Sequence, residues 1–168
     1  MGIAGMGFSQ AWALGIVDVG LIVLSHCENP AKNEAINFIE KIYLGEINAK
    51  IPLTSFIGAY HIMTKYLKIN KETVKTELLK TLNIRSPIYI QDISIDQAIK
   101  AIENAVKYNI EGWDGYLVSL ADSLGANIIY TIDRKLAKIK HISIVVPIKR
   151  ETLKKYHKWI KEELEKRN

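Results

Sequence analysis

The sequence predicts an α/β protein, a three-layer α/β/α sandwich with a mostly parallel central sheet. Short apolar runs typical of buried strands alternate with longer segments of helical periodicity, which favours parallel strands joined by helices. The chain of 168 residues is long enough for one core, and its 48% hydrophobic and 24% charged residues form a globular composition. We therefore expect an N-terminal extension at residues 1–10, one folded domain at 11–148, and a basic amphipathic helix at 149–168 packed on that domain.

The first strand is expected at residues 13–17, and the apolar segment 19–24 that follows is expected to cover one end of the sheet. Asn29 and Pro30 then predict a helix start, with Asn as the cap and Pro at the first helical position. The inward positions of this helix are Ile36, Ile39 and Tyr43.

A brief strand-like step at residues 49–53 precedes a helix that begins near Thr54 or Ser55. Asn70 is the expected cap of the next helix. Helical spacing predicts two inward faces, the first formed by Phe56, Tyr60, Met63 and Leu67 and the second by Val74, Leu78 and Leu82.

After an extended segment at residues 87–93, the sequence from Ser94 to Gln97 fits a capping box that opens another helix. Apolar residues recur along this helix at the spacing of one face, which predicts the stripe by which such helices usually pack on the core. The stripe consists of Ile95, Ile99, Ile102 and Val106.

The last part of the chain contains two helices and two strands. A helix over residues 113–124 is closed by Gly125, which suits the left-handed position after a helix. Strands are expected at 127–132 and 141–148. The inward residues of the final helix are Leu153, Tyr156, Ile160 and Leu164.

Basic residues gather at the end of the chain. The whole sequence has a formal charge of +5, but residues from Asp133 onward hold 12 basic and 5 acidic residues, and the preceding part is net negative. This end is either an ordinary solvated helix or a surface that faces nucleic-acid phosphates. The single cysteine, Cys27, excludes an intramolecular disulfide framework and a multi-cysteine metal site, and favours a reducing compartment.

The apolar beginning of the chain does not have the pattern of an export signal. The first 26 residues lack a basic segment, and Asp18 interrupts the apolar stretch. No other segment has about 18 uninterrupted apolar residues, as a membrane span requires. We expect a cytoplasmic protein without a membrane association.

Three aspartates are placed where a parallel sheet would bring them together. Asp18 ends the first strand, Asp133 ends a later one, and Asp114 lies in the first turn of a helix that leads into a strand. The carboxyl ends of parallel strands share one edge, where ligands bind in open sheets. Each acid alone also fits a structural role, as a strand-end residue, a helix cap or a turn residue. Glu111, just before the helix, could also reach this edge.

Clustered carboxylates raise each other's pKa unless a positive charge lies between them. A divalent cation is the simplest such charge. Oxygen ligands suit Mg²⁺ or Mn²⁺, and the sequence has no cysteine cluster or paired histidines for zinc. Such a metal can activate water and stabilise charge on a phosphodiester. Arg134 and Lys135, beside Asp133, are candidates for contact with nucleic-acid phosphates or are ordinary solvated charges.

These motifs together resemble the PIN-domain family, metal-dependent nucleases that include the VapC-type toxins of toxin–antitoxin pairs. The matching segments are 16–22, 113–116 with 119–121, and 124–126 with 130–133, in the same order and spacing. The resemblance implies that residues 11–148 form a PIN-like nuclease domain, and that Asp18, Asp114 and Asp133 are catalytic residues that bind the metal directly or through water. It also implies that Thr131 orients the last acid.

Two positions depart from the family pattern. The family usually has a glutamate early in the second long helix, where this sequence has Gly58, and a hydroxyl residue often follows the first aspartate, where this sequence has Val19. His61 lies three residues beyond Gly58 on the same helix face and is either a supporting ligand or proton-transfer group, or a structural histidine.

We therefore expect a metal-dependent endoribonuclease that hydrolyses RNA phosphodiester bonds. The alternative is a catalytically degenerate PIN-like module that binds RNA or protein, which the glycine at position 58 favours. If the resemblance to toxins holds, it also implies an antitoxin partner and a homodimer.

Overall fold

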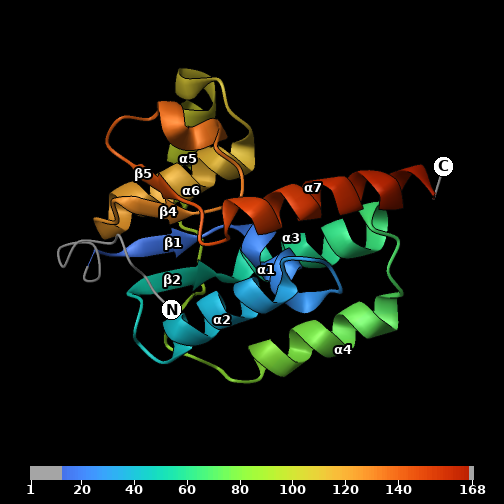
Figure 1. Ribbon diagram of the computed structural model, residues 1–168. Helices are drawn as coiled ribbons and strands as arrows, with labels where there is room; N and C mark the ends of the chain where they lie inside the picture. Colours follow the sequence, from blue (N-terminus) through green and yellow to red (C-terminus); the bar gives the residue numbers. More distant parts are fainter. Residues whose placement is uncertain (1–12, 167–168) are drawn as a thin grey trace.

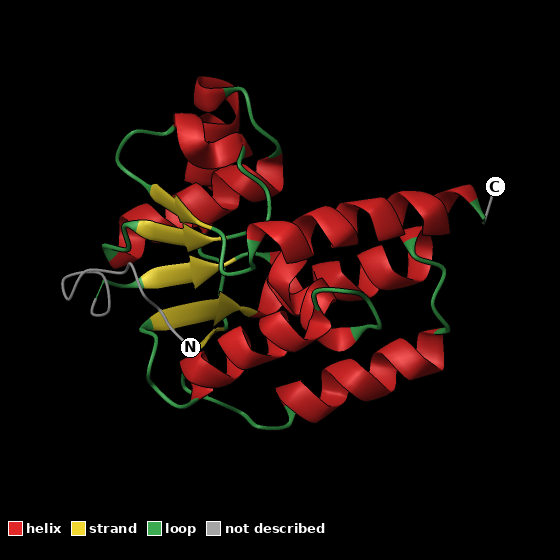
Figure 2. Ribbon diagram, viewed as in Figure 1, coloured by secondary structure: helices red, strands yellow, loops and turns green. Residues whose placement is uncertain are grey.

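Within residues 13–166, a five-stranded, all-parallel sheet lies at the centre and helices cover both of its faces, which confirms the predicted three-layer α/β/α sandwich (Figures 1 and 2). The computed structural model describes residues 13–166, so the expected extension at residues 1–10 lies outside the described residues. The strands follow the order β3-β2-β1-β4-β5, which puts the first strand in the middle. Their bounds are β1 Gly15–Val17, β2 Ala49–Pro52, β3 Tyr89–Ile90, β4 Ile128–Tyr130 and β5 Ser143–Val145.

Alternation along the two central strands divides the core into two layers. Strands β1 and β4 are paired in parallel, with Gly15 beside Ile128. Neighbouring residues along each strand point to opposite faces of the sheet. Val17 and Tyr130 contribute to the core on one face, and Ile16 contributes to the core on the other. Both central strands are fully buried, which explains their continuous apolar sequence.

The first face is covered by helices from the first half of the chain and by the last helix. They are α1 Val19–His26, α2 Lys32–Tyr43, α3 Leu53–His61, α4 Lys71–Leu82 and α7 Arg150–Glu165. The apolar segment 19–24 is therefore the body of a helix.

Asn70 caps α4 as predicted, accepting hydrogen bonds from two backbone N–H groups. Tyr60 is wrongly predicted as inward, because it is 38% exposed at the end of α3, just before the π-helical turn Ile62–Tyr66.

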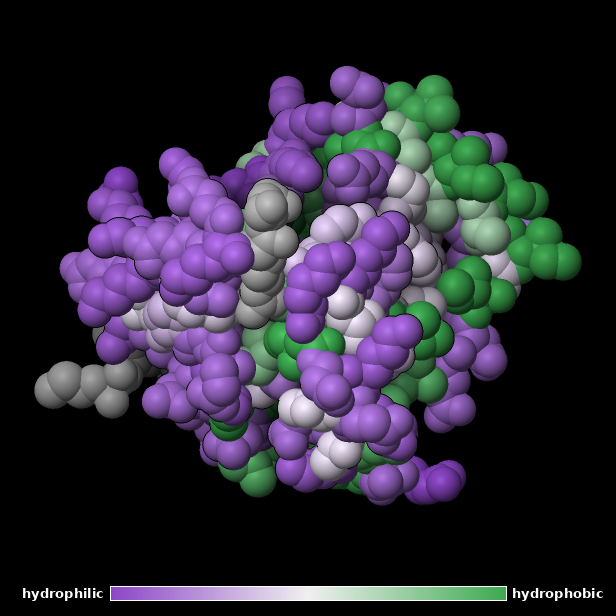
Figure 3. All heavy atoms as spheres, turned by 90° about the vertical axis from the view of Figure 1, so that its right-hand side faces the viewer, coloured by the Kyte–Doolittle hydropathy of each residue, from purple (hydrophilic) through white to green (hydrophobic). Residues whose placement is uncertain are grey.

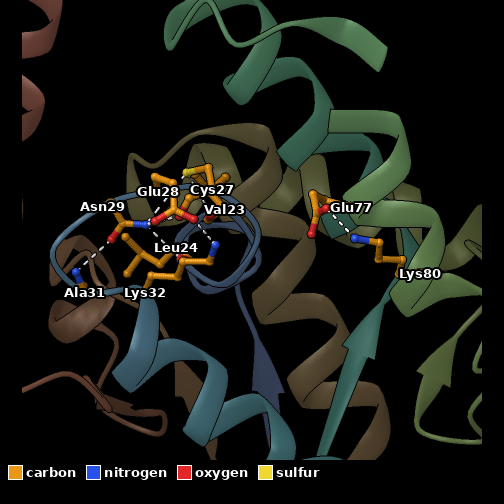
Figure 4. A network of polar contacts seen from close by, with 9 residues as sticks. All are labelled: Val23, Leu24, Cys27, Glu28, Asn29, Ala31, Lys32, Glu77 and Lys80. Carbon is orange, nitrogen blue, oxygen red and sulfur yellow. Dashed lines mark hydrogen bonds and ion pairs between the residues drawn. The ribbon is translucent and has the colours of Figure 1, made fainter. Parts of the chain in front are cut away.

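The start of α2 also differs from the prediction. The helix begins at Lys32, and the Asn29 side chain instead ties the preceding loop together (Figure 4). Its amide nitrogen donates to the carbonyls of Leu24 and Cys27, both at 2.8 Å, and its oxygen accepts from the N–H of Ala31 at 2.9 Å. Asn29 thus satisfies the carbonyls at the end of α1 as well as a donor ahead of α2.

The final helix packs on this same layer. Tyr156 is buried in the core that α1 and α2 form, and Glu34 of α2 accepts hydrogen bonds from the Lys149 backbone at 2.7 Å and the Thr152 hydroxyl at 2.5 Å. Leu164, predicted to face inward, is 40% exposed near the helix end.

Two helices, α5 Ile95–Tyr108 and α6 Gly112–Leu124, cover the second face. The predicted capping box opens α5, and Gly125 closes α6 with φ of +64°. The contact between these helices is close: a Cβ on Gly115 would lie 2.1 Å from the backbone oxygen of Ala101. Ala101 is the buried residue of α5, while the apolar stripe is exposed, so the expected inward packing of the stripe is wrong.

A short 3₁₀ helix, Lys135–Lys138, joins the end of the β4 segment to β5. No helix within residues 13–166 has the length and apolarity needed to cross a membrane.

Candidate functional site

A cleft of about 410 Å³ opens beyond the carboxyl ends of the central strands. Its walls come from the starts of α1 and α6, the body of α3 and the turn after β4. The charged and polar residues along it are Asp18, Thr54, Ser55, His61, Glu111, Asp114, Asp133 and Lys135. The three aspartates that the sequence placed at one sheet edge therefore line one cleft, together with Glu111.

Asp18 is held in place by hydrogen bonds to both carboxylate oxygens. One oxygen caps α1 by accepting from the N–H of Val19 at 2.6 Å, and the other accepts from the Thr131 hydroxyl at 2.7 Å. Burial raises the pKa of Asp18, and the nearby Asp133 charge adds to the rise, while the two hydrogen bonds oppose it. The carboxylate is thus fixed in orientation but poorly neutralised.

Thr131 connects two of the acids. Its hydroxyl donates to Asp18 and accepts from the backbone N–H of Asp133 at 3.0 Å, and the residue itself is buried at the end of β4. The resemblance implied that this threonine orients the last acid. In the structure its hydroxyl bonds the side chain of the first acid and the backbone of the last.

Asp133 has a cation beside it. The Lys135 amine lies 3.4 Å from one Asp133 carboxylate oxygen and 4.0 Å from Glu111, and the Lys135 backbone N–H donates to the other Asp133 oxygen at 3.0 Å. The side-chain interaction of the amine with Asp133, together with the charges of Asp133 and Glu111, raises the pKa of Lys135. Lys135 therefore brings a positive charge to the mouth of the cleft, whereas Arg134 is exposed and does not line it.

Asp114 experiences the field of the whole cluster. Burial, which is the largest cause, and the charges of Asp18, Glu111 and Asp133 together raise its pKa to about 6, against the opposing effect of Lys135. Since three carboxylates act on one, the acids are electrostatic neighbours as well as members of one cleft.

The remaining predicted positions lie on α3. Gly58 and His61 both line the cleft, so this helix face is turned toward the acids. A Cβ on Gly58 would lie 3.1 Å from a methyl carbon of Val19, which is close but leaves room for a side chain after a small adjustment. The His61 ring packs edge-on against Tyr66, with centroids 5.6 Å apart.

Sequence reasoning missed the aromatic residues that line the cleft. Trp113 is 64% exposed, and its ring meets that of Tyr116 edge-on, 6.3 Å between centroids, while Tyr66 lies on the α3 side. The signal was available for two of them: Trp113 precedes Asp114 directly, and Tyr116 follows two residues later in the first turns of the same helix.

The donor chemistry of the cleft fits a hard divalent cation, because the ligands on offer are carboxylate oxygens whose charges are only partly balanced. Across residues 13–166, however, no three histidine, cysteine, aspartate or glutamate side chains are grouped so as to hold a metal ion directly. Mg²⁺ commonly binds through one or two carboxylates and retains several waters, which needs no such group. Water-mediated ligation is therefore the mode that these residues fit.

Comparisons with known proteins give a fold likeness. No family model and no curated protein matches the chain. Among solved structures, the chain is similar to one from a toxin–antitoxin complex of Klebsiella pneumoniae, with 16% sequence identity and a TM-score of 0.53. The match covers 79% of this chain and 97% of that one. At this identity the likeness shows that the two chains share a fold.

Proposed function

We propose that the protein is a metal-dependent endoribonuclease of the PIN-domain kind. The observation that carries the proposal is the convergence of Asp18, Asp114 and Asp133, from three separate segments, on one cleft at the carboxyl edge of a parallel sheet. Open parallel sheets bind ligands at this edge. Burial, and after it the charges of Asp18, Glu111 and Asp133, raise the pKa of Asp114 to about 6, which supports a site whose carboxylates lack sufficient counter-charge.

Each group in the cleft has a role in this proposal. A bound Mg²⁺ or Mn²⁺ would activate water and stabilise negative charge on the phosphodiester. Asp18, held by Thr131, and Asp114 would retain the ion, in part through water. Lys135 at the mouth would contact a phosphate of the RNA backbone, and the exposed face of Trp113 offers a stacking surface for an unpaired base. Single-stranded RNA is therefore the substrate that the cleft suits best.

A toxin role is the second part of the proposal. The shared fold with a chain of a toxin–antitoxin complex supports it, and the sequence resemblance to VapC-type toxins points the same way. On this proposal the protein cleaves cellular RNA when free and is restrained by a small antitoxin protein.

The test is RNA cleavage by the purified protein. With Mn²⁺ the protein should cut single-stranded RNA, and Asp114→Asn should abolish the cleavage. Asp122→Asn is the matched control, because Asp122 lies on the same helix but outside the cleft, with an oxygen 2.9 Å from the His141 ring. Equal cleavage by the Asp114 variant and the wild type would refute the assignment of the site.

The glycine at position 58 gives a second, independent test. Gly58→Glu adds a carboxylate to the α3 side of the cleft and should strengthen Mn²⁺ binding in a calorimetric titration. Gly58→Gln has nearly the same size without the charge and should leave the affinity close to the wild-type value. Equal affinities for the two variants would show that position 58 does not face the ion.

A degenerate binding module is the alternative, and two observations favour it: the absence of a carboxylate at position 58, and the lack of a direct three-ligand group within residues 13–166. Such a module would bind RNA in EDTA with an affinity that falls as salt rises, and would show no metal-stimulated cutting. The same RNA, assayed for binding and for cleavage, distinguishes the two functions.

A further inference from the structure

The acids of the cleft differ in what their carboxylate oxygens contact. Asp18 has a donor on each oxygen, the Val19 N–H at 2.6 Å and the Thr131 hydroxyl at 2.7 Å. Within residues 13–166, the carboxylate of Asp114 accepts no hydrogen bond, and only burial and neighbouring charges act on it. Asp114 is therefore the acid of the cleft whose oxygens are most open to an ion.

Both oxygens of Asp133 are engaged by one residue, Lys135. The Lys135 backbone N–H donates to the first oxygen at 3.0 Å, and its amine lies 3.4 Å from the second. The same amine lies 4.0 Å from a Glu111 carboxylate oxygen. Because Lys135 opens the short 3₁₀ helix Lys135–Lys138, the turn after β4 fixes it two residues from Asp133. One cation thus serves two acids on this side of the cleft.

The charge of the cleft suits Lys135 together with one divalent ion. Four carboxylates line the cleft, and they carry four negative charges when all are ionised. Lys135 and one divalent ion bring three positive charges, which leaves the cleft slightly negative. Lys135 and two divalent ions would bring five, and the excess cations would repel one another. The four acids are Asp18, Glu111, Asp114 and Asp133.

The contacts of Lys135 oppose a second ion in the same way. Two-metal sites hold their ions about 3.5–4 Å apart, so that one ion stabilises the attacking oxygen and the other the leaving oxygen. An ion held by Asp133 and Glu111 would have to displace the Lys135 amine, which lies within 4.0 Å of both carboxylates. Helix α3 offers no replacement ligand of this kind, since Gly58 lines the cleft without a carboxylate.

Lys135 must compete with cations from solution, because the ion pair is accessible to water. The side chains of Lys135 and Asp133 are 62% and 49% exposed. Figure 3 shows the side of the molecule toward which the strands point in Figure 1, and apart from an apolar area at the upper right this face is largely hydrophilic. An isolated exposed pair contributes little. Lys135, however, is attached two residues from Asp133 and is held there by its backbone bond, which gives its amine a high effective concentration beside the acid.

We propose that Lys135 is a built-in cation that replaces a second metal ion, so that the cleft holds a single divalent ion beside Asp18 and Asp114. Asp133 then holds Lys135 in position instead of binding the metal. The proposal rests on the metal-dependent nuclease function proposed above and adds to it the number of ions and the role of this lysine. An ammonium group has three donors, so Lys135 can serve its two acids and still contact an RNA phosphate.

The number of bound ions tests the proposal without any measurement of activity. Mn²⁺ is titrated by calorimetry at pH 8, and the free ion is counted by its electron paramagnetic resonance signal. The wild type should bind one Mn²⁺ per chain. Lys135→Met, which keeps the length of the side chain but removes its charge, should bind two. Lys135→Arg restores the cation and should bind one. Adding Asp133→Asn to Lys135→Met should also return the number to one, because the second ion loses a ligand.

Lys138→Met is the matched control. It removes the same charge from the same 3₁₀ helix, but the Lys138 amine donates to the Asn109 carbonyl at 3.0 Å instead of pairing with an acid, so this variant should bind one ion. Circular dichroism would confirm that all variants keep the wild-type helix content. Two ions on the wild type or on Lys138→Met, or one ion on Lys135→Met, would overturn the proposal.

RNA cleavage separates this proposal from the nuclease function on which it rests. A wild type that cuts RNA with Mn²⁺ but gives the wrong ion numbers would overturn the role of Lys135 alone. The expected ion numbers without any cleavage would overturn the nuclease function and leave the single-ion site in place. A wild type that binds no Mn²⁺ would overturn both.

Discussion

Gly115→Ala should destabilise the protein by separating α5 from α6. A Cβ at this position would lie 2.1 Å from the Ala101 oxygen and 3.0 Å from the Ala105 nitrogen, both backbone atoms that cannot rotate away. Ordinary C···O contacts lie at about 3.3 Å or more, so the helices must part by about 1 Å. Overpacking of this kind costs about 1–3 kcal/mol, and the rigid partners place this case near the upper end.

The helix propensity of alanine returns up to about 1 kcal/mol, so the expected net loss is about 2 kcal/mol. For a chain of this length that corresponds to a decrease in Tm of about 4–8 °C. Thermal unfolding followed by circular dichroism measures it. Gly112→Ala on the same helix is the control, because nothing lies within 4 Å of its added Cβ and the Tm should not fall. A Gly115→Ala variant as stable as this control would refute the close helix contact.

Two further predictions concern the cleft. In EDTA at pH 8, Asp114→Asn should raise the Tm by about 2–4 °C: a pKa raised from 3.8 to about 6 corresponds to about 3 kcal/mol, which solvent screening of this half-buried group reduces to about 1 kcal/mol. Between these pH values the native state holds more protons than the unfolded state, so this group makes the wild type less stable as pH rises through the window. The advantage of Asn is complete above about pH 6 and absent below 3.8, and an unchanged Tm at pH 8 would contradict it. Thr131→Val should lower the free energy of unfolding in urea at pH 7 by about 1.5–3 kcal/mol. The reason is that Asp18 loses a charged hydrogen bond at 2.7 Å and the backbone N–H of Asp133 loses its acceptor. A variant as stable as the wild type would show that these hydrogen bonds are unimportant for stability.

Local chemistry explains where the sequence predicted the fold well. Asn70, the Ser94 capping box and Gly125 act on backbone groups within a few residues, and each does in the structure what its sequence context indicates. Asn29 also acts locally, because its amide donates to carbonyls two and five residues before it and its oxygen accepts from the N–H of Ala31, yet the helix begins only at Lys32. A cap residue therefore predicts a hydrogen-bonded chain reversal more securely than it predicts the first residue of a helix.

Periodicity identified the apolar face of α5 but could not tell what covers it. The same spacing buries Val74 and Leu78 on α4 and exposes Ile95 and Val106 on α5. The difference depends on the partner helix: Gly115 lets α6 approach α5 on the side of Ala101, so small residues make the contact and the large ones remain outside.

For the cleft, the sequence predicted which acids come together but not how a cation is placed among them. Strand ends and a helix start were enough to predict that Asp18, Asp114 and Asp133 share one edge of the sheet, because parallel topology decides that. Sequence spacing could not show that the Lys135 amine lies between Asp133 and Glu111, since the 3₁₀ turn after β4 determines its direction.

Helix α6 connects the cleft to helix α5, since Asp114 in its first turn lines the cleft and Gly115 beside it packs against α5. A change at Gly115 should therefore disturb both the acids of the cleft and the packing of α5, whereas Asp114→Asn alters only the cleft.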